Sequence, residues 1–124
     1  GYMGRGKLRE GLYRRLKKIG YNLPVIYDPS SIISSTAKIG EGVFIGKNAV
    51  INADAKVEKM SIINTKALVE HECVVEEYAH IAVGAVLCGQ VRVGKASFIG
   101  ANATVIQGRI IEAETIVPAG AVIR

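Results

Sequence analysis

Aliphatic residues recur at every sixth position of this chain over residues 27–122. The repeat divides this range into sixteen units of six residues, hereafter hexads, with no insertion between them. The fifth position of most hexads is small, and Gly stands second in four of them. The first positions, all aliphatic after the initial Tyr, are Tyr27, Ile33, Ile39, Ile45, Ile51, Val57, Ile63, Val69, Val75, Ile81, Leu87, Val93, Ile99, Val105, Ile111 and Val117.

This period of six predicts a coil with three short sides. An α-helix would repeat about every 3.6 residues, and hairpin turns would recur about every 8–12 residues. With one hexad per side, a turn takes about eighteen residues, and successive turns pair as parallel strands about 4.8 Å apart. The aliphatic residues then point inward, each contributing about 1.5–3 kcal/mol when buried. We therefore expect an all-β fold, a parallel β-helix over residues 27–124.

Two details of the repeat need a local explanation. We expect the glycines in second position, such as Gly40 and Gly94, to suit corners where φ is positive. Arg109 stands in a fifth position, where the other hexads have smaller residues. Either the coil is distorted there or the Arg109 side chain turns outward.

Residues 6–19 predict one short α-helix ahead of the repeat. Its apolar residues recur at helical spacing and form a stripe, and they are Leu8, Leu12, Leu16 and Ile19. Gly20 is a typical C-terminal stop, and an extended connector follows. We expect two parts: residues 1–26 as helix and connector, a remnant of a missing N-terminal domain, and residues 27–124 as the β-helix.

Charge is distributed unevenly between these two parts. The net charge is +5, but seven of the sixteen basic residues lie in the first twenty positions, opposed only by Glu10. From Tyr27 onward nine basic residues face ten acidic ones. A basic helix is able to bind nucleic acid or anionic lipid. Without interleaved aromatic residues or a nucleic-acid motif, a solvated helix face is the better interpretation, and we expect neither nucleic acid nor membrane as a partner.

The two cysteines, Cys73 and Cys88, are too few for the disulfide framework of a small secreted domain. The first twenty residues are basic and amphipathic, without the continuous apolar stretch of a signal peptide. We therefore expect a cytoplasmic protein.

Residues 62–90 resemble the hexapeptide-repeat sugar acetyltransferases of the NeuD/PglD type. That family includes sialic-acid O-acetyltransferases and N-acetyltransferases of nucleotide-linked amino sugars. The elements that carry the resemblance are Asn64-Thr65, the run Glu70-His71-Glu72-Cys73, and His80-Ile81. The resemblance implies a left-handed coil, acetyl-CoA as co-substrate, no metal, and a homotrimer with the donor in the groove between neighbouring chains.

The resemblance also implies roles for individual residues. His71 is the expected general base, taking a proton from a sugar amine or hydroxyl as it attacks the thioester. Imidazole, with an ordinary pKa near 6.5, is largely neutral at cytoplasmic pH. Glu72 would hold the His71 ring, His80 would contact acetyl-CoA, and the backbone N–H near Gly89 would face the thioester oxygen.

Residues on later turns match the places where the family holds the rest of the donor. Backbone groups of Ala101 and Ala119 would meet the pantetheine arm. The CoA phosphates would find charge partners in Arg92, Lys95 and Arg109. Asn64 is a weaker candidate, for orienting groups near His71.

The family's nucleotide-sugar-binding N-terminal domain and its C-terminal tail have no counterpart in these 124 residues. We therefore expect the chain to be the β-helix part of such an enzyme. Whether the acceptor atom is nitrogen or oxygen, and which sugar carries it, stays open.

Three alternatives remain beside this reading. A zinc-dependent carbonic anhydrase shares the fold, but it generally needs three protein ligands, and the chain has two histidines. A non-catalytic trimerising scaffold, or a truncated inactive relative, would need neither His71 nor Glu72. Cys73 suggests a thiol nucleophile, but its fifth position in the hexad favours buried packing.

Overall fold

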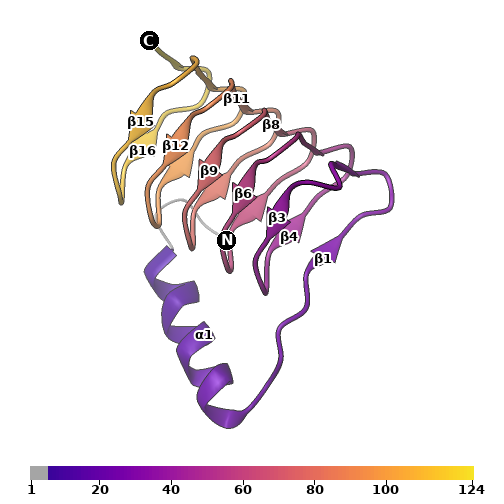
Figure 1. Cartoon of the computed structure of the whole chain (residues 1–124). Coiled ribbons are helices and arrows are strands. Elements are labelled where there is room, and N and C mark those ends of the chain that lie inside the picture. Colours follow the sequence, from indigo (N-terminus) through magenta and orange to yellow (C-terminus); the bar gives the residue numbers. More distant parts are fainter. Residues whose placement is uncertain (1–5) are drawn as a thin grey trace.

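The computed structural model describes residues 6–124, and residues 1–5, which include Arg5, lie outside the described part. One helix, α1 (Gly6–Ile19), precedes seventeen two-residue strands. Each strand except the last three pairs in parallel with the strand three places later in the chain. The chain therefore winds into stacked turns with three flat sides (Figure 1). Each turn of the coil takes eighteen residues, as in the pairing of Ile63 with Ile81 and of Ile81 with Ile99. The predicted left-handed parallel β-helix with one short helix is confirmed.

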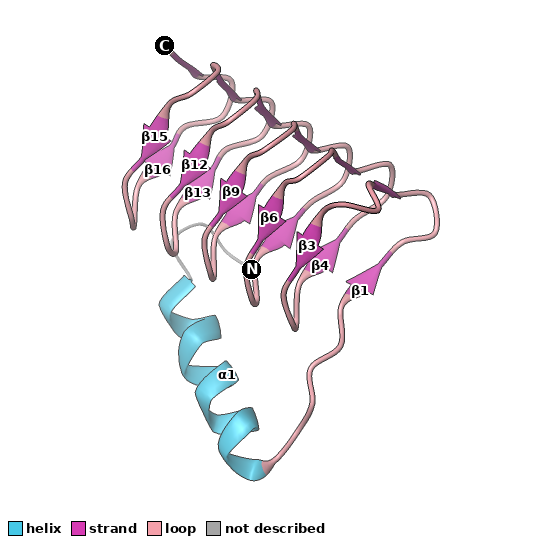
Figure 2. Ribbon diagram, viewed as in Figure 1, coloured by secondary structure: helices cyan, strands magenta, loops and turns pink. Residues whose placement is uncertain are grey.

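The three sides are three parallel sheets. Sheet A comprises β1 (Ile26–Tyr27), β4 (Phe44–Ile45), β7 (Ile62–Ile63), β10 (His80–Ile81), β13 (Phe98–Ile99) and β16 (Ile116–Val117). Sheet B comprises β2 (Ile32–Ile33), β5 (Val50–Ile51), β8 (Leu68–Val69), β11 (Val86–Leu87), β14 (Thr104–Val105) and β17 (Val122–Ile123). Sheet C comprises β3 (Lys38–Ile39), β6 (Lys56–Val57), β9 (Val74–Val75), β12 (Arg92–Val93) and β15 (Ile110–Ile111). Four-residue turns form the A–B, B–C and C–A edges between them (Figure 2).

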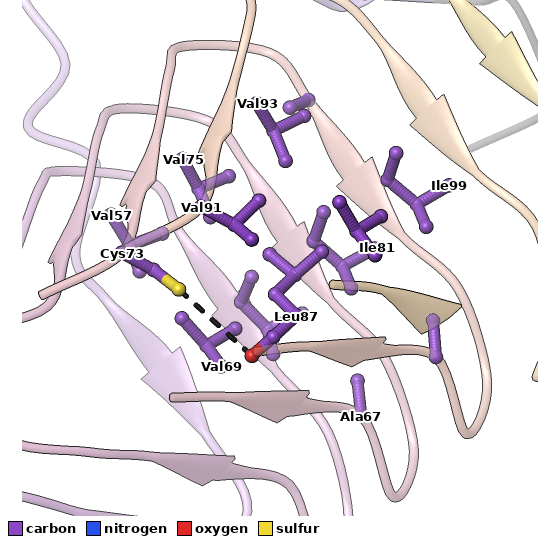
Figure 3. Packing of buried hydrophobic residues seen from close by; sticks show 14 of the residues in the cluster. Val57, Ala67, Val69, Cys73, Val75, Ile81, Leu87, Val91, Val93 and Ile99 are labelled. Atoms are coloured by element: carbon purple, nitrogen blue, oxygen red, sulfur yellow. Dashed lines mark hydrogen bonds between the residues drawn. The ribbon is translucent and has the colours of Figure 1, made fainter. Parts of the chain in front are cut away.

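The inward residues fill the coil as the hexad pattern predicts. The second residue of each strand is the first position of a hexad, and from Ile45 to Val105 every one is fully buried or nearly so. Small fifth-position residues such as Ala67 and Cys73 lie among them, and Figure 3 shows this packing around Leu87. Because the buried residues form one continuous core along the coil, each turn is stabilised by packing against its neighbouring turns.

The positive φ angles lie at a different position from the predicted one. From Gly42 to Gly120 the fourth residue of every hexad has positive φ, while the second-position glycines do not. The turned backbone lets the fourth-position N–H donate to the preceding turn of the coil, as Gln90 N–H does to the His71 carbonyl at 2.9 Å. That hydrogen bond offsets the roughly 1–2 kcal/mol cost of a left-handed non-Gly residue.

The second-position glycines have another reason to be glycine. A Cβ on Gly94 would collide with the backbone nitrogen of Ala113, and a Cβ on Gly40 would lie 2.7 Å from that of Lys59. These glycines therefore allow close approach between successive turns of the coil, and the prediction of positive φ there was wrong.

Arg109 follows the second of its two predicted alternatives. Its side chain is exposed, and the ladder is not distorted, because Arg92 N–H still donates to the Arg109 carbonyl at 3.0 Å and β12 still pairs with β15.

Helix α1 has the predicted bounds and lies along the C–A edge (Figure 1). Arg9 donates hydrogen bonds to the carbonyls of Met60 and of Tyr78, the second at 2.8 Å. Tyr13 donates to the Glu41 carboxylate and meets the Tyr78 ring edge to face. A polar face therefore docks α1 onto the coil.

The predicted apolar stripe of α1 does not make this contact. Leu8, Leu12 and Ile19 are 63%, 45% and 68% exposed. The helix is amphipathic, as the spacing indicates, but the docked face is set by hydrogen bonds to turn carbonyls. Gly20 ends the helix with φ of 108° and donates to the Leu16 and Lys17 carbonyls, as predicted.

Two glycine substitutions test the close-approach explanation. We expect Gly94→Ala to lower the free energy of unfolding by about 1–3 kcal/mol, because the turns of the coil must separate to admit the methyl group. Gly11→Ala, in α1 with nothing within 4 Å of the added Cβ, should instead stabilise by about 0.5–1 kcal/mol. Urea denaturation measures both, and equal effects would contradict the explanation.

Candidate functional site

The B–C edge carries His71 and Glu72 in the turn between β8 and β9. Both residues are fixed through the backbone: Glu72 N–H donates to the Ala53 carbonyl, and the His71 carbonyl accepts from Gln90, each at 2.9 Å. His71 Nδ1 lies 3.2 Å from Glu72 Oε1. A carboxylate only accepts, so Nδ1 donates its proton to this contact, and in the neutral ring Nε2 keeps its lone pair.

Gly89 lies on the next turn of the coil, directly against the His71 ring. A Cβ at residue 89 would collide with Nε2 and Cε1 of His71. Only glycine at this position therefore leaves room for the His71 ring. Within residues 6–124 the Gly89 N–H donates to no acceptor. The edge therefore combines a proton acceptor, a carboxylate behind it and an unused backbone donor.

In a single chain these groups are open to solvent. The side chains of His71 and Glu72 are 47% and 54% exposed. An exposed pair of this kind contributes little to stability. The arrangement is therefore better explained by chemistry at the edge than by folding.

His80 has the opposite environment. It is the outward residue of β10 in sheet A, yet only 6% exposed. The Phe98 ring meets it edge to face at 5.0 Å, and Asn64 Nδ2 lies 3.3 Å from its Nε2. Burial, with a smaller effect of the Arg9 charge, lowers the pKa of His80 to about 4. The ring is therefore neutral at physiological pH.

His80 lines a groove of about 750 Å³ along sheet A and the A–B edge. Phe98 and Ile116 line the sheet side, and Ala101 and Ala119 line the edge side. Small residues at successive turns leave the backbone accessible to an elongated ligand. Ala101 and Ala119, predicted for the donor arm, therefore lie in one groove with His80.

A smaller hollow of about 320 Å³ lies toward the N-terminal end of the same edge. Tyr27, Phe44, Lys47 and Thr65 are among its lining residues. It meets the groove at the Asn64–Thr65 turn, since Asn64 lines one and Thr65 the other.

One chain does not bring all six predicted site residues together. His71, Glu72 and Gly89 lie at the B–C edge, while His80, Ala101 and Ala119 lie on sheet A and the A–B edge. Sheet B separates the two groups. A single site built from both groups needs two chains.

The structure places the remaining candidates elsewhere. Asn64, predicted near His71, instead contacts His80. Arg92 pairs with Glu76 at 2.6 Å on sheet C, and Lys95 pairs with Glu10 at 3.1 Å at the C–A edge. Neither basic side chain lines the groove.

Phe98 and Ile116 were missed from the sequence. They follow His80 by eighteen and thirty-six residues, so reading outward positions at the period of the coil would have found them.

Cys73 has the predicted packing role. It is fully buried, and its thiol donates to the Cys88 carbonyl at 3.1 Å. Burial raises the pKa of Cys73 to about 11, so the thiol stays protonated and is a poor nucleophile.

Two features are absent from residues 6–124, the described part of the chain. No cluster of three or more His, Cys, Asp or Glu side chains has the arrangement of a metal site. No described helix has the length and apolarity to cross a membrane.

Comparison with known proteins identifies sugar acetyltransferases as similar proteins. Residues 21–124 match the family described as GMPPB C-terminal domain. PerB from Caulobacter crescentus, solved in complex with CoA and GDP-perosamine, is 38% identical with a TM-score of 0.96 over 98% of this chain and 59% of that chain. The predicted resemblance to sugar acetyltransferases of the NeuD/PglD type is confirmed.

Two further similar proteins are also acetyltransferases. The acetyltransferase domain of PglB from Neisseria gonorrhoeae, in complex with acetyl coenzyme A, is 30% identical with a TM-score of 0.91 over 98% of this chain and 61% of that chain. GDP-perosamine N-acetyltransferase from Escherichia coli O157:H7 is 26% identical over 82% of this chain and 46% of its own length. The chain thus spans about half to three fifths of these relatives.

The depressed pKa of His80 predicts a pH effect on stability. The unfolded ring titrates near 6.5 and the folded ring near 4. The unfolded state binds more protons between these values, so the stability present above about pH 6.5 is lost as pH falls toward 4. We expect His80→Gln to reduce this loss, measured by urea denaturation from pH 7 to 4.5. Equal pH slopes in the two proteins would contradict the burial argument.

Proposed function

We propose that this chain, which belongs to the family of the GMPPB C-terminal domain, transfers an acetyl group from acetyl-CoA to the amine of a nucleotide-linked sugar, with His71 as general base. The observation that carries the proposal is the His71 ring, held by Glu72 on one nitrogen and lying against Gly89 with the other. Similar proteins that bind CoA and GDP-perosamine support the two substrates.

The chemistry needs one proton acceptor and one oxyanion donor. The sugar amine attacks the thioester carbon while His71 Nε2 takes its proton, and the Glu72 carboxylate stabilises the resulting imidazolium. The Gly89 N–H donates to the developing oxyanion. Collapse of the tetrahedral intermediate releases CoA as thiolate, which recovers the proton from His71. No enzyme-bound acyl group is required.

The donor would occupy the groove along sheet A. His80, Ala101 and Ala119 line it, and its elongated shape at the A–B edge suits a pantetheine arm. The acceptor would approach through the hollow beside Thr65, at the end of the groove nearer His80. Acetyl-CoA as co-substrate and two free cysteines support a cytoplasmic location.

We further propose a homotrimer, because one half of the site lies at the B–C edge and the other on sheet A and the A–B edge. The outward residues of sheets A and B are apolar apart from His80 and Thr104, whereas sheet C presents Lys38, Lys56 and Arg92. Two apolar faces per prism suit contact with two neighbours. Such packing would bring the B–C edge of one copy to the groove of the next and desolvate His71.

Substitution of the base tests the chemistry. We expect His71→Ala to reduce acetyl transfer about 10²–10⁴-fold while the melting temperature stays almost unchanged, because the side chain is half exposed. Transfer is measured by CoA release with GDP-perosamine as acceptor. Full activity of His71→Ala would refute the assignment.

A glutamate pair supplies the matched control. Glu72→Gln should lower kcat, whereas Glu114→Gln, also exposed and with φ of 58°, should not.

A sialic acid assayed in parallel as acceptor distinguishes O-acetyl transfer from N-acetyl transfer. A wild-type chain that binds no acetyl-CoA would instead favour the scaffold alternative.

Charge on each outer face tests the assembly. Leu68→Glu, in the middle of sheet B, should dissociate the trimer, because a carboxylate would be buried in an apolar contact. Val74→Glu, the equivalent outward position of sheet C, should leave it intact. Sedimentation velocity gives the mass of each. A monomeric wild type would contradict the proposal, and so would a trimeric Leu68→Glu.

A further inference from the structure

The orientation of the Asn64 amide is fixed by its own turn. Thr65 N–H donates to Asn64 Oδ1 at 2.7 Å. A backbone N–H cannot accept, so the oxygen of the amide must lie on that side. The Nδ2 group therefore points the other way, where His80 Nε2 lies at 3.3 Å.

An amide NH₂ group donates only, so the facing ring nitrogen must accept. We infer that Asn64 holds His80 as the neutral tautomer protonated at Nδ1, with the Nε2 lone pair occupied, and so acts as a positioning residue that bars His80 from accepting the substrate's proton. The inference deepens the proposed function, on which its catalytic meaning rests.

The surroundings of His80 agree with a fixed neutral ring. The Phe98 ring edge packs on it, and Nδ1 is buried without a partner among the described residues. Arg9 of α1 is the described charged side chain whose field acts on the ring, and it opposes protonation. Neither neighbour offers a carboxylate to attract the proton to Nε2.

The two histidines then have the same tautomer and different capacities. In His71 the Nδ1–H group donates a hydrogen bond to Glu72, and the Nε2 lone pair has no hydrogen-bond donor facing it among the described residues. In His80 the equivalent Nε2 lone pair faces Asn64. One half of the site thus supplies the base, while the other supplies a neutral wall for the donor groove.

Asn64→Asp inverts the interaction at nearly constant shape. The new carboxylate still accepts from Thr65 N–H, but it presents an acceptor to His80. We expect the proton to move to Nε2 and the ring to titrate at higher pH. Asn48→Asp, exposed and one turn of the coil earlier on the same edge, adds the same charge without facing a ring and should change neither.

Ring ¹⁵N chemical shifts of ¹⁵N-histidine protein measure the tautomer directly. The chain has only two histidines, and His71→Ala assigns the signals. The wild-type spectrum should show protonated Nδ1 and bare Nε2 at His80, a test that needs no variant at residue 64. Protonated Nε2, or averaged tautomers, would overturn the inference, as would ring shifts unaffected by Asn64→Asp.

Kinetics give a second readout that a merely structural role would not move. The KM for acetyl-CoA should rise about 2–10-fold in Asn64→Asp, as expected for one altered hydrogen bond, and a second group should enter the pH profile. An unchanged KM and profile would overturn the role in the groove. If acetyl transfer is absent altogether, the proposed function fails, while the NMR result still decides the tautomer.

Discussion

Parallel pairing between residues eighteen apart is the constraint on which the rest of this molecule depends. Once Ile63, Ile81 and Ile99 stack as one inward file, every other residue inherits a neighbour at the same spacing. Gly89 comes to lie against His71, and Phe98 against His80. The backbone hydrogen bonds between successive turns of the coil also fix the candidate site in place. Both the His71 carbonyl and the Glu72 N–H take part in these hydrogen bonds.

This rigidity explains how exposed side chains can have defined geometry. His71 lies at an edge open to solvent, yet its backbone is fixed above and below. The proposed role of His71 as general base needs such support, since loss of orientation costs rate even when the chemistry is intact. His80 obtains its order differently, from burial against Phe98 and a directed contact with Asn64. The two histidines thus differ in exposure and in contacts because of their surroundings, although their residue type is the same.

The fold was predictable from sequence because the repeat encodes it redundantly. Sixteen hexads keep phase, so a single exception such as Arg109 does not alter the register. Predictions that depended on one local contact were less secure. The apolar stripe of α1 had the right period, but Arg9 and Tyr13 determine which face docks. Gly94 is glycine because of Ala113, a neighbour nineteen residues away that no local rule reveals.

The sequence by itself determined the coil, its inward file, the bounds of α1 and the candidate residues His71, Glu72 and His80. Periodicity and resemblance suffice for these, since both are properties of the chain read in order. Only the tertiary structure decided that Asn64 faces His80, that His80 is buried although it points outward, and that the six predicted site residues fall into two groups on either side of sheet B. Those facts depend on which side chains from different turns of the coil contact one another, and these contacts are determined by how the turns stack.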